Sequence, residues 1–361
     1  MPNDFLKARK NCHVQEFQKL PALGTDMSTV HSLNVGQGDC TLIQHNSGRT
    51  SLIDICKGNY QPPSSLTFFD YLFNQDDERP RLASDFGMSK KPTNPLSYLS
   101  GIGITSLFRF ILTHPDMDHL DGFAALMNKL SLTVFWDSGV RKEKPNFENY
   151  PEYKEEDWDA YVSVRDGKQA IHVNAGGGFK YANRDEDGSV GGDGLYILAP
   201  DKDLVATANE CGDVNDASYV LLYRSRGGRI VIPGDAHDET WDYVIKHHKD
   251  DVANCSVLFA PHHGRKSGRN FDFLNVLRPK ITFFGCASSG HLAYNAWSSR
   301  KLPVLTNNQA GNIVLECGES RIDIYVENAE FAKACGCDLD IKNNQGYVYY
   351  HATVEPVKST A

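Results

Sequence analysis

Short apolar runs separated by turn-forming residues open the patterned part of the chain. Residues 30–35, 40–45 and 50–56 read VHSLNV, CTLIQH and TSLIDIC, with GQGD and NSGR between them. Glycine, asparagine, serine and aspartate favour tight turns, so this pattern predicts a meander of short strands. Residues 1–27 show no periodicity, and we expect a lead-in that is frayed or disordered.

Strands and helices alternate through the rest of the chain. The segment LFRFILT at residues 107–113 predicts a buried strand, and LDGFAALMNKL at 120–130 has the apolar spacing of a helix. Further strands are predicted at 132–139, 195–200, 218–237 (a pair with a Gly-Gly turn), 255–268 (running into a loop), 280–288 and 311–317, and helices at 151–168, 239–250 and 292–302. The charges of residues 151–168 are expected to be solvated.

This alternation predicts an α/β fold with two sheets flanked by helices, in a single domain over residues 28–361. A polar, proline-rich span at about residues 57–95 interrupts it and is expected to be an insertion or a lid. It contains a candidate helix at residues 68–75. The aromatic residues there fit a buried helix face better than a surface for stacking bases; they are Phe68, Phe69, Tyr71 and Phe73.

Composition narrows the function only a little. The chain has 361 residues, a formal net charge of −9 and a pI of about 5.8, which argues against a broad basic face for nucleic acid. There is no signal-peptide pattern, and no apolar run approaches the roughly 20 residues of a membrane helix. Nine scattered cysteines, an odd number, fit reduced thiols. We therefore expect a cytoplasmic protein without a membrane segment.

The strand at residues 107–113 ends in a crowded polar motif, THPDMDHLDG. His114, Asp116, Asp118 and His119 follow one bend, because Pro115 biases His114 toward an extended conformation. Crowded carboxylates repel one another, and a divalent cation removes that penalty while imidazoles add neutral ligands. The alternative is a helix-capping cluster in which an aspartate is the N-cap and the histidines are incidental.

Two later strand ends carry the same residue types. IVIPGDAH places Asp235 after an apolar run, and VLFAPHHGRKSG places His262 and His263 in a loop. Each alone is more often a turn than a site. Together they favour a site, because the strand ends of one sheet layer lie side by side and can supply ligands for two metals.

The ordered set of motifs resembles the metallo-β-lactamase superfamily, and within it the branch represented by the soluble domain of the ComEC-type DNA-uptake channel. The resemblance runs through about residues 30 to 317, and it rests on NVGQGDC, LIDIC, THPDMDHLDG, NDASYVLL, IPGDA and PHHGRKSG. It implies an αββα metallo-β-lactamase-like sandwich with insertions and a metal site at one edge between the two sheets.

The resemblance also implies roles for single residues. Asp54 would orient the metal-binding loop, and Asp235 would bridge two ions. Asp39 belongs to the glycine-rich opening turn of the branch. The metal-binding loop maps onto His114, Asp116, Asp118 and His119, and the last histidine maps onto His262 or His263, between which the sequence does not choose.

Two departures bear on the metal. Asp116 stands where the commoner pattern has histidine, and Asn215 and Ser218 stand near the place of a further histidine, which is missing. More carboxylates and fewer nitrogens make the site harder, which shifts preference from zinc toward manganese or magnesium. The expected cofactor is one or two divalent ions, manganese or zinc, with magnesium as a third option.

The resulting hypothesis is a phosphodiester hydrolase, nuclease-like on nucleic acid and preferably on single strands. A divalent metal lowers the pKa of bound water toward about 7. The resemblance implies that Asp118 ligates the metal and holds the resulting hydroxide. The loop after the histidines would bind phosphate through Arg265, Lys266, Ser267 and Arg269, unless it is simply a solvated loop. His291 is either a late helper residue of the site or a helix-start histidine.

Two other classes stay open. A hydrolase of an ester, lactone or lactam would suit a site richer in zinc and histidine. A non-catalytic interaction module would keep the metal as a structural clip and act through a protein partner of unknown kind. The presence of Asp118, His119, Asp235 and both later histidines favours catalysis, because a degenerate site more often has lost one of them.

Overall fold

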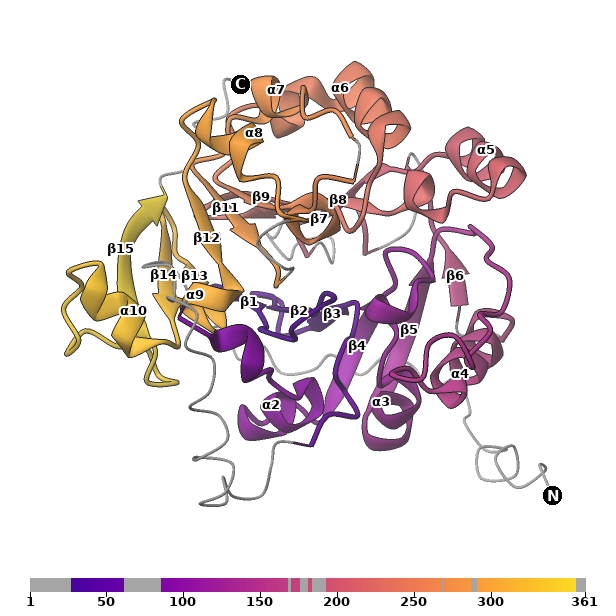
Figure 1. The fold of residues 1–361 in the computed structure, drawn as a ribbon, viewed down its shortest axis with the longest axis horizontal. Coiled ribbons are helices and arrows are strands. Elements are labelled where there is room, and N and C mark those ends of the chain that lie inside the picture. Colours follow the sequence, from indigo (N-terminus) through magenta and orange to yellow (C-terminus); the bar gives the residue numbers. More distant parts are fainter. Residues whose placement is uncertain are drawn as a thin grey trace.

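The computed structural model describes residues 27–61, 86–167, 170–175, 181–183, 193–267, 269–286 and 291–354. The predicted lead-in, most of the predicted insertion and its candidate helix at residues 68–75 lie outside these residues. The described chain forms two packed β-sheets with helices on their outer faces (Figure 1).

The first sheet has nine strands in the order β15-β14-β13-β1-β2-β3-β4-β5-β6. The predicted meander is its centre, where β1, β2 and β3 pair in antiparallel fashion. From β3 to β6 the strands run parallel, because a helical segment returns the chain between them. The strands are β1 (Ser28–Ser32), β2 (Thr41–Gln44), β3 (Thr50–Ile53), β4 (Ser106–Ile111), β5 (Ser131–Asp137), β6 (Ala170–His172), β13 (Ile313–Cys317), β14 (Ile322–Val326) and β15 (Val348–Val354).

The second sheet has six strands in the order β12-β11-β10-β9-β8-β7. Strands β7, β8 and β9 are antiparallel, and β9 to β12 are parallel. Their bounds are β7 (Leu195–Ala199), β8 (Val220–Ser225), β9 (Gly228–Ile232), β10 (Val257–Phe259), β11 (Ile281–Phe284) and β12 (Val304–Thr306).

Helices cover both outer faces (Figure 1). The first sheet is covered by α2 (Pro95–Gly101), α3 (Phe123–Lys129) and α4 (Glu155–Arg165), and the second by α6 (Asp238–Val252), α7 (Leu274–Leu277) and α8 (Tyr294–Ser298). The remaining helices are α5 (Lys202–Cys211), α9 (Asn307–Ala310) and α10 (Ala329–Ala334). The predicted αββα sandwich is confirmed.

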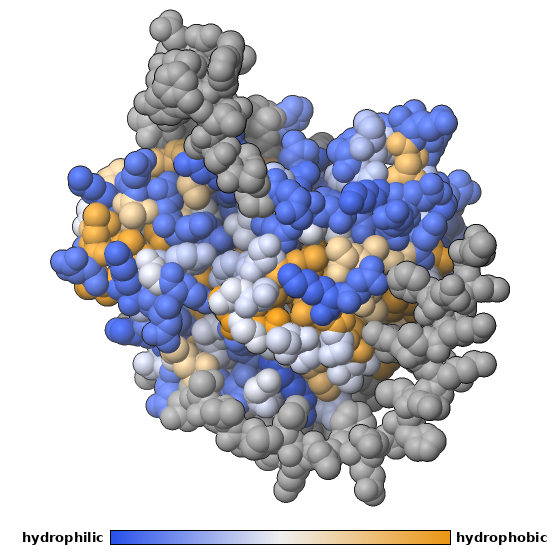
Figure 2. All heavy atoms as spheres, turned by 90° about the horizontal axis from the view of Figure 1, so that it is seen from below, coloured by the Kyte–Doolittle hydropathy of each residue, from blue (hydrophilic) through white to orange (hydrophobic). Residues whose placement is uncertain are grey.

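Three hydrophobic layers hold the sandwich together. Trp136 and Leu221 belong to the layer between the sheets, Phe123 to the layer under α2, α3 and α4, and Trp241 and Trp297 to the layer under α6, α7 and α8. Figure 2 views the molecule from below and shows a mostly hydrophilic surface broken by small hydrophobic patches. None of the helices in the described ranges combines the length and the apolar character that a membrane crossing requires.

Several predicted boundaries need correction. The helix expected at residues 120–130 starts only at Phe123, because Gly122 has a φ of 103° and a 3-10 turn precedes it. The helix expected at 292–302 is only α8, and the chain turns at Lys301, which has a φ of 57°. The charges of α4 are not all solvated, since Asp157 is buried. Strands β14 and β15, beyond residue 317, were not predicted.

Candidate metal centre

The polar motifs meet where loops from both sheets come together. Asp54 follows β3, and the loop of His114 and His119 follows the neighbouring parallel strand β4. Asp235 follows β9, and His263 follows its parallel neighbour β10. Because parallel neighbours end at the same edge of a sheet, each sheet brings a pair of loops to the centre.

Two glycines allow the backbones to approach closely enough. Gly234 has a φ of 50°, and a Cβ there would lie 2.4 Å from Ser218 Oγ and 2.7 Å from Thr113 Cβ. Gly38 has a φ of 112°, and a Cβ there would lie 2.3 Å from the carbonyl oxygen of Asp118. Only glycine fits at either position, so the turns bring Asp235 and Asp39 against the metal-binding loop.

A buried carboxylate fixes the orientation of His119. Asp54 accepts hydrogen bonds from the backbone N–H of Thr113 (2.8 Å), the Thr113 hydroxyl (2.7 Å) and Nδ1 of His119 (2.7 Å). Since a carboxylate only accepts, Nδ1 carries a proton, and Nε2 is the nitrogen that can bind a metal. That Nε2 lies 3.4 Å from Asp235 Oδ1.

In two further histidines Nδ1 is also the donor, and Nε2 also faces the centre. His263 donates Nδ1–H to Asp39 (3.1 Å), and its Nε2 lies 3.3 Å from Asp118 Oδ2. His114 places Nδ1 3.1 Å from Thr113 Oγ1, whose own proton goes to Asp54, so His114 is the donor. Its Nε2 lies 3.8 Å from Asp235 Oδ2. All three rings are buried and turn Nε2 toward the carboxylates of the centre.

The inward atoms fit a divalent cation. Nε2 of His114, Nε2 of His119 and Oδ1 of Asp235 are buried and make no hydrogen bond. Leaving such atoms unpaired costs roughly 1–3 kcal/mol each, and a cation satisfies nitrogen and carboxylate ligands together. One ligand atom from each of Asp39, His119, Asp235 and His263 lies within 4.8 Å of the others. Anchoring of each histidine through its second nitrogen is typical of metal sites.

The charges of the centre stabilise one another. Burial alone would raise the pKa of Asp235, but His263 and His119 lower it well below its usual range. Burial alone would lower the pKa of His263, but Asp39 and Asp235 raise it to about 10. Without a cation the cluster is therefore a network of imidazolium and carboxylate, in which a divalent ion would take the place of protons.

Asp116 is held away from the other carboxylates. Its Oδ1 accepts a bond of 2.5 Å from Nζ of Lys142, and its Oδ2 lies 3.7 Å from Nε2 of His114. Burial would raise the pKa of Asp116, but His114 and Lys142 lower it to about 2. Lys142 was not among the predicted site residues, because it lies beyond β5 in a segment with no motif.

The double histidine diverges. His262 and His263 have φ values of 53° and 59°, and their rings are at 81° to each other. His262 lies at the border of the cluster, with Nε2 3.5 Å from Asp235 Oδ2. Its Nδ1 is contacted by the guanidinium of Arg269 and lies 3.4 Å from the Ser267 hydroxyl. His263 alone of the two belongs to the cluster of four.

The remaining predicted residues lie around the centre. Ser218 accepts the backbone N–H of Asp235 at 3.1 Å and so supports the turn at Gly234. Asn215 donates to Nε2 of His237 at 3.3 Å, away from the four-residue cluster. His291 is exposed, and its backbone carbonyl, rather than its ring, accepts the N–H of Lys266 (2.8 Å). Arg265 is half-buried and Lys266 is exposed beside the double histidine.

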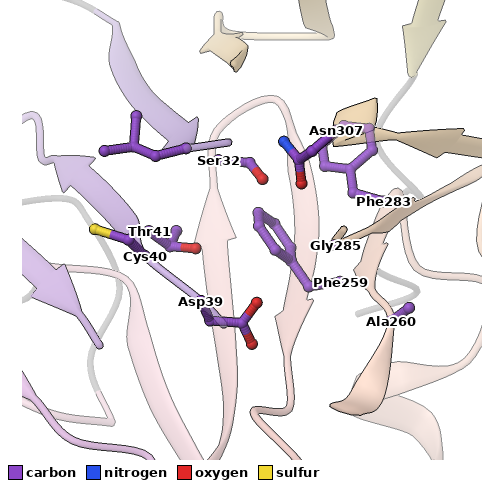
Figure 3. Close-up of a pocket in the computed structure, with 10 residues that line it drawn as sticks. Ser32, Asp39, Cys40, Thr41, Phe259, Ala260, Phe283, Gly285 and Asn307 are labelled. Atoms are coloured by element: carbon purple, nitrogen blue, oxygen red, sulfur yellow. The ribbon is translucent and has the colours of Figure 1, made fainter. Parts of the chain in front are cut away.

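A narrow pocket leads from Asp39 into the space between the sheets (Figure 3). Thr41 and Ser32 of the first sheet line one side, and Phe259 and Phe283 of the second line the other. It has room for little more than a water molecule. The centre is open to solvent at its carboxylates, since the side chains of Asp118, Asp116 and Asp39 are 20%, 26% and 32% exposed.

Comparison with known proteins adds little to this picture. No family model matches the chain, and no curated protein matches it. Among solved structures, CmlA, a diiron beta-hydroxylase from Streptomyces venezuelae, is 10% identical with a TM-score of 0.40 over 80% of this chain and 54% of that one. A mutant of the CmlA beta-hydroxylase is 9% identical with a TM-score of 0.39 over 80% and 53%. This chain thus spans about half the length of these two structures, and the metal centre rests on its own geometry.

Proposed function

We propose that the protein is a divalent-metal-dependent hydrolase of phosphodiester bonds, nuclease-like and acting on nucleic acid, with a preference for single strands. The observation that carries the proposal is the convergence of three buried histidine Nε2 atoms on Asp235 and Asp118, two of them without a hydrogen-bond partner. A divalent ion bound there would polarise a phosphoryl oxygen and lower the pKa of an attacking water.

The residues of the chain have distinct roles in this proposal. Asp118 is partly exposed and its Oδ2 faces His263, while Oδ1 lies 4.0 Å from Nε2 of His119. The carboxylate is thus placed to bind the ion and to orient an attacking water. Asp235 is buried and faces histidines that follow strands of both sheets. Asp54 and Asp39 hold His119 and His263 in the tautomer that leaves Nε2 free.

Two features favour a phosphodiester over a carbonyl substrate. The centre is rich in carboxylates, which suits hard cations such as manganese and magnesium and their phosphate ligands. Cations also border it: Lys142 contacts Asp116, and Arg269 contacts His262. Fixed positive groups stabilise the charge that develops on a phosphoryl group during transfer.

The test uses metal-stripped protein with bis-p-nitrophenyl phosphate and a labelled single-stranded oligonucleotide, each with manganese, magnesium or zinc restored. We expect manganese-dependent cleavage of both, reduced at least about 100-fold by Asp118→Ala. Asp159→Ala is the matched control, because Asp159 lies on α4 in an exposed pair with Lys144.

Other outcomes overturn the proposal in defined ways. Zinc-supported hydrolysis of an ester or lactam, with both phosphodiesters intact, would assign the chain to carbonyl chemistry. Tight metal binding without turnover of any of these substrates would leave the interaction module as the better description.

A further inference from the structure

We propose that the centre holds one divalent ion rather than two, and that Lys142 and Arg269 supply the positive charge that a second ion would bring. This inference rests on the proposed function, because it concerns the same centre. It goes further by fixing the number of ions and by naming two cationic side chains that act on the substrate.

The ligands for the first ion are complete. Nε2 of His119 and Nε2 of His263 both face Asp235, at 3.4 and 3.8 Å, and Asp118 lies 3.3 Å from His263. Behind each ring a carboxylate accepts the hydrogen bond from Nδ1: Asp54 for His119 and Asp39 for His263. Each of the two Nε2 atoms thus lies within 4.0 Å of the carboxylates of both Asp118 and Asp235.

On the other side of Asp235 a lysine already binds one of the ligands for a second ion. His114 Nε2 is available, 3.8 Å from Asp235 Oδ2. Asp116, which would complete that side, is bound by Nζ of Lys142 at 2.5 Å. A divalent ion between His114, Asp116 and Asp235 would share the Asp116 carboxylate with the Lys142 ammonium, and repulsion between the two cations disfavours a second ion.

His262 does not replace the missing ligand, because its Nδ1 accepts a hydrogen bond, whereas Nδ1 of His119 and of His263 donates one. An arginine guanidinium is always a donor, so Nδ1 of His262 accepts from Arg269. In the neutral ring the proton is then on Nε2, the atom 3.5 Å from Asp235 Oδ2. A nitrogen that carries a proton cannot bind a metal, so His262 donates to Asp235 instead of ligating.

Asn215 supplies no nitrogen ligand there, and its Oδ1 is buried without a hydrogen-bond partner. Its amide nitrogen donates to Nε2 of His237, whose Nδ1 is in turn 2.8 Å from Asp213. These contacts turn the amide nitrogen toward a separate group of residues beside α6. The position at which the resemblance leads us to expect a further histidine therefore supplies no imidazole to the centre.

Positive charge nevertheless stands on that side. Arg269 is anchored by a bond of 2.7 Å to the carbonyl oxygen of Ala236 and reaches Asp235 through the His262 ring. Lys142 reaches the same carboxylate through Asp116 and His114. The two cations contact opposite members of the unfinished second site. A phosphate bound to the first ion would place its remaining oxygens between them.

The primary test counts ions without using activity. Metal-stripped protein is titrated with manganese by calorimetry, and the manganese form is studied by electron paramagnetic resonance. We expect one ion per chain and the hyperfine pattern of an isolated manganese ion. Two ions of similar affinity, or the spectrum of an exchange-coupled pair, would overturn the inference.

Variants test the two cations separately. Lys142→Met releases Asp116, so we expect a second, weaker binding event, whereas Lys144→Met, which breaks only the exposed pair with Glu155 and Asp159, should titrate like the wild type. Unchanged stoichiometry in Lys142→Met would contradict the role given to Lys142.

Arg269→Met should lower kcat for the phosphodiester about 100-fold while one ion stays bound. Arg300→Met, on the surface near Asp272, is its control. Wild-type kcat in Arg269→Met would contradict the role given to Arg269.

The outcomes separate this inference from the proposed function. One tightly bound ion without phosphodiester cleavage would remove the function and keep the ion count. Two bound ions with manganese-dependent cleavage would keep the function and remove the inference.

Discussion

At the scale of single residues, backbone conformation decides where the chemistry points. Asp54, His262 and His263 all have positive φ values, of 57°, 53° and 59°, an uncommon conformation for residues with side chains. Each turns the chain sharply after a strand. The consecutive pair sends one imidazole into the centre and the other to its border.

Gly234 provides a residue-scale prediction. Gly234→Ala should weaken manganese affinity at least about 10-fold, because a Cβ would displace Ser218 or Thr113 and move Asp235. Both this variant and Gly212→Ala should lose about 1 kcal/mol of stability from their positive φ, and Gly234→Ala should lose more because of the overlap. Of these two glycines, Gly212 is the one with open space around its Cβ position. Calorimetric titration compares the two, and equal metal affinities would show that the close approach at Gly234 does not matter.

The sequence predicts which residue types gather but not how each ring is turned. His114, His119, Asp118 and Asp235 are recognisable from motif and strand end alone. The choice between His262 and His263 depends on Asp39 and Arg269, which contact them from different parts of the fold. No local pattern carries that information, and the same holds for Lys142.

At the scale of elements, a side chain of α4 caps the N-terminus of α3. Gly122 precedes α3 and has no side chain with which to cap its amide groups. Asp157 of α4 takes that role, accepting from the N–H groups of Gly122 (3.0 Å) and Ala124 (2.8 Å). Asn59 donates to the same carboxylate at 3.0 Å. The helix that follows the metal-binding loop is thus fixed from outside.

Asp157→Ala should therefore lower the free energy of unfolding by about 1–3 kcal/mol, because two buried amide groups lose their acceptor. Asp159→Ala, on the same helix but in an exposed pair with Lys144, should change it by less than about 1 kcal/mol. Urea unfolding of both variants measures the difference. Equal stability of the two would contradict the capping role.

Periodicity in the sequence identifies most elements but does not predict that α4 caps α3. The apolar spacing of α3 and the alternation of β1, β2 and β3 are local and predict those elements well. A charged segment such as α4 is by default assigned to solvent, whereas Asp157 is buried by a partner from another helix. Strand β14 gains its place by pairing with β13 on one side and β15 on the other.

At the scale of the whole molecule, a buried neutral histidine links the central strand to a covering helix. Nδ1 of His31 on β1 is 2.8 Å from the Tyr98 hydroxyl of α2. Its Nε2 is 2.8 Å from Thr29 Oγ1 and 3.1 Å from Gln44 Oε1. Burial lowers the pKa of His31 to about 4, although the bond to Gln44 acts against this shift.

A lowered pKa means that the folded state resists protonation, so this contribution to stability is present above pH 6.5 and is lost as the pH falls toward 4. The loss at pH 4 is about 3 kcal/mol. His31→Gln should reduce the dependence of unfolding free energy on pH in this window, whatever its stability at pH 7. Urea unfolding between pH 7 and 4 measures this. A slope equal to that of the wild type would contradict the assignment.

The layer architecture follows from the sequence because alternating strands and helices must bury their apolar faces in sheets covered by helices. The order of strands within a sheet does not follow, because it depends on pairings between distant segments. Strand β1 illustrates this, since it lies between β2 and β13.

The pairing of β1 with β13 has a consequence for synthesis on the ribosome. Ser28 is opposite Cys317 in this register, so the first of the described strands waits for β13, far along the chain, before its second edge is covered. Until then the nascent chain exposes an unsatisfied strand edge, the kind of surface that recruits chaperones or pairs with another chain. The centre of the first sheet thus becomes protected only late in synthesis.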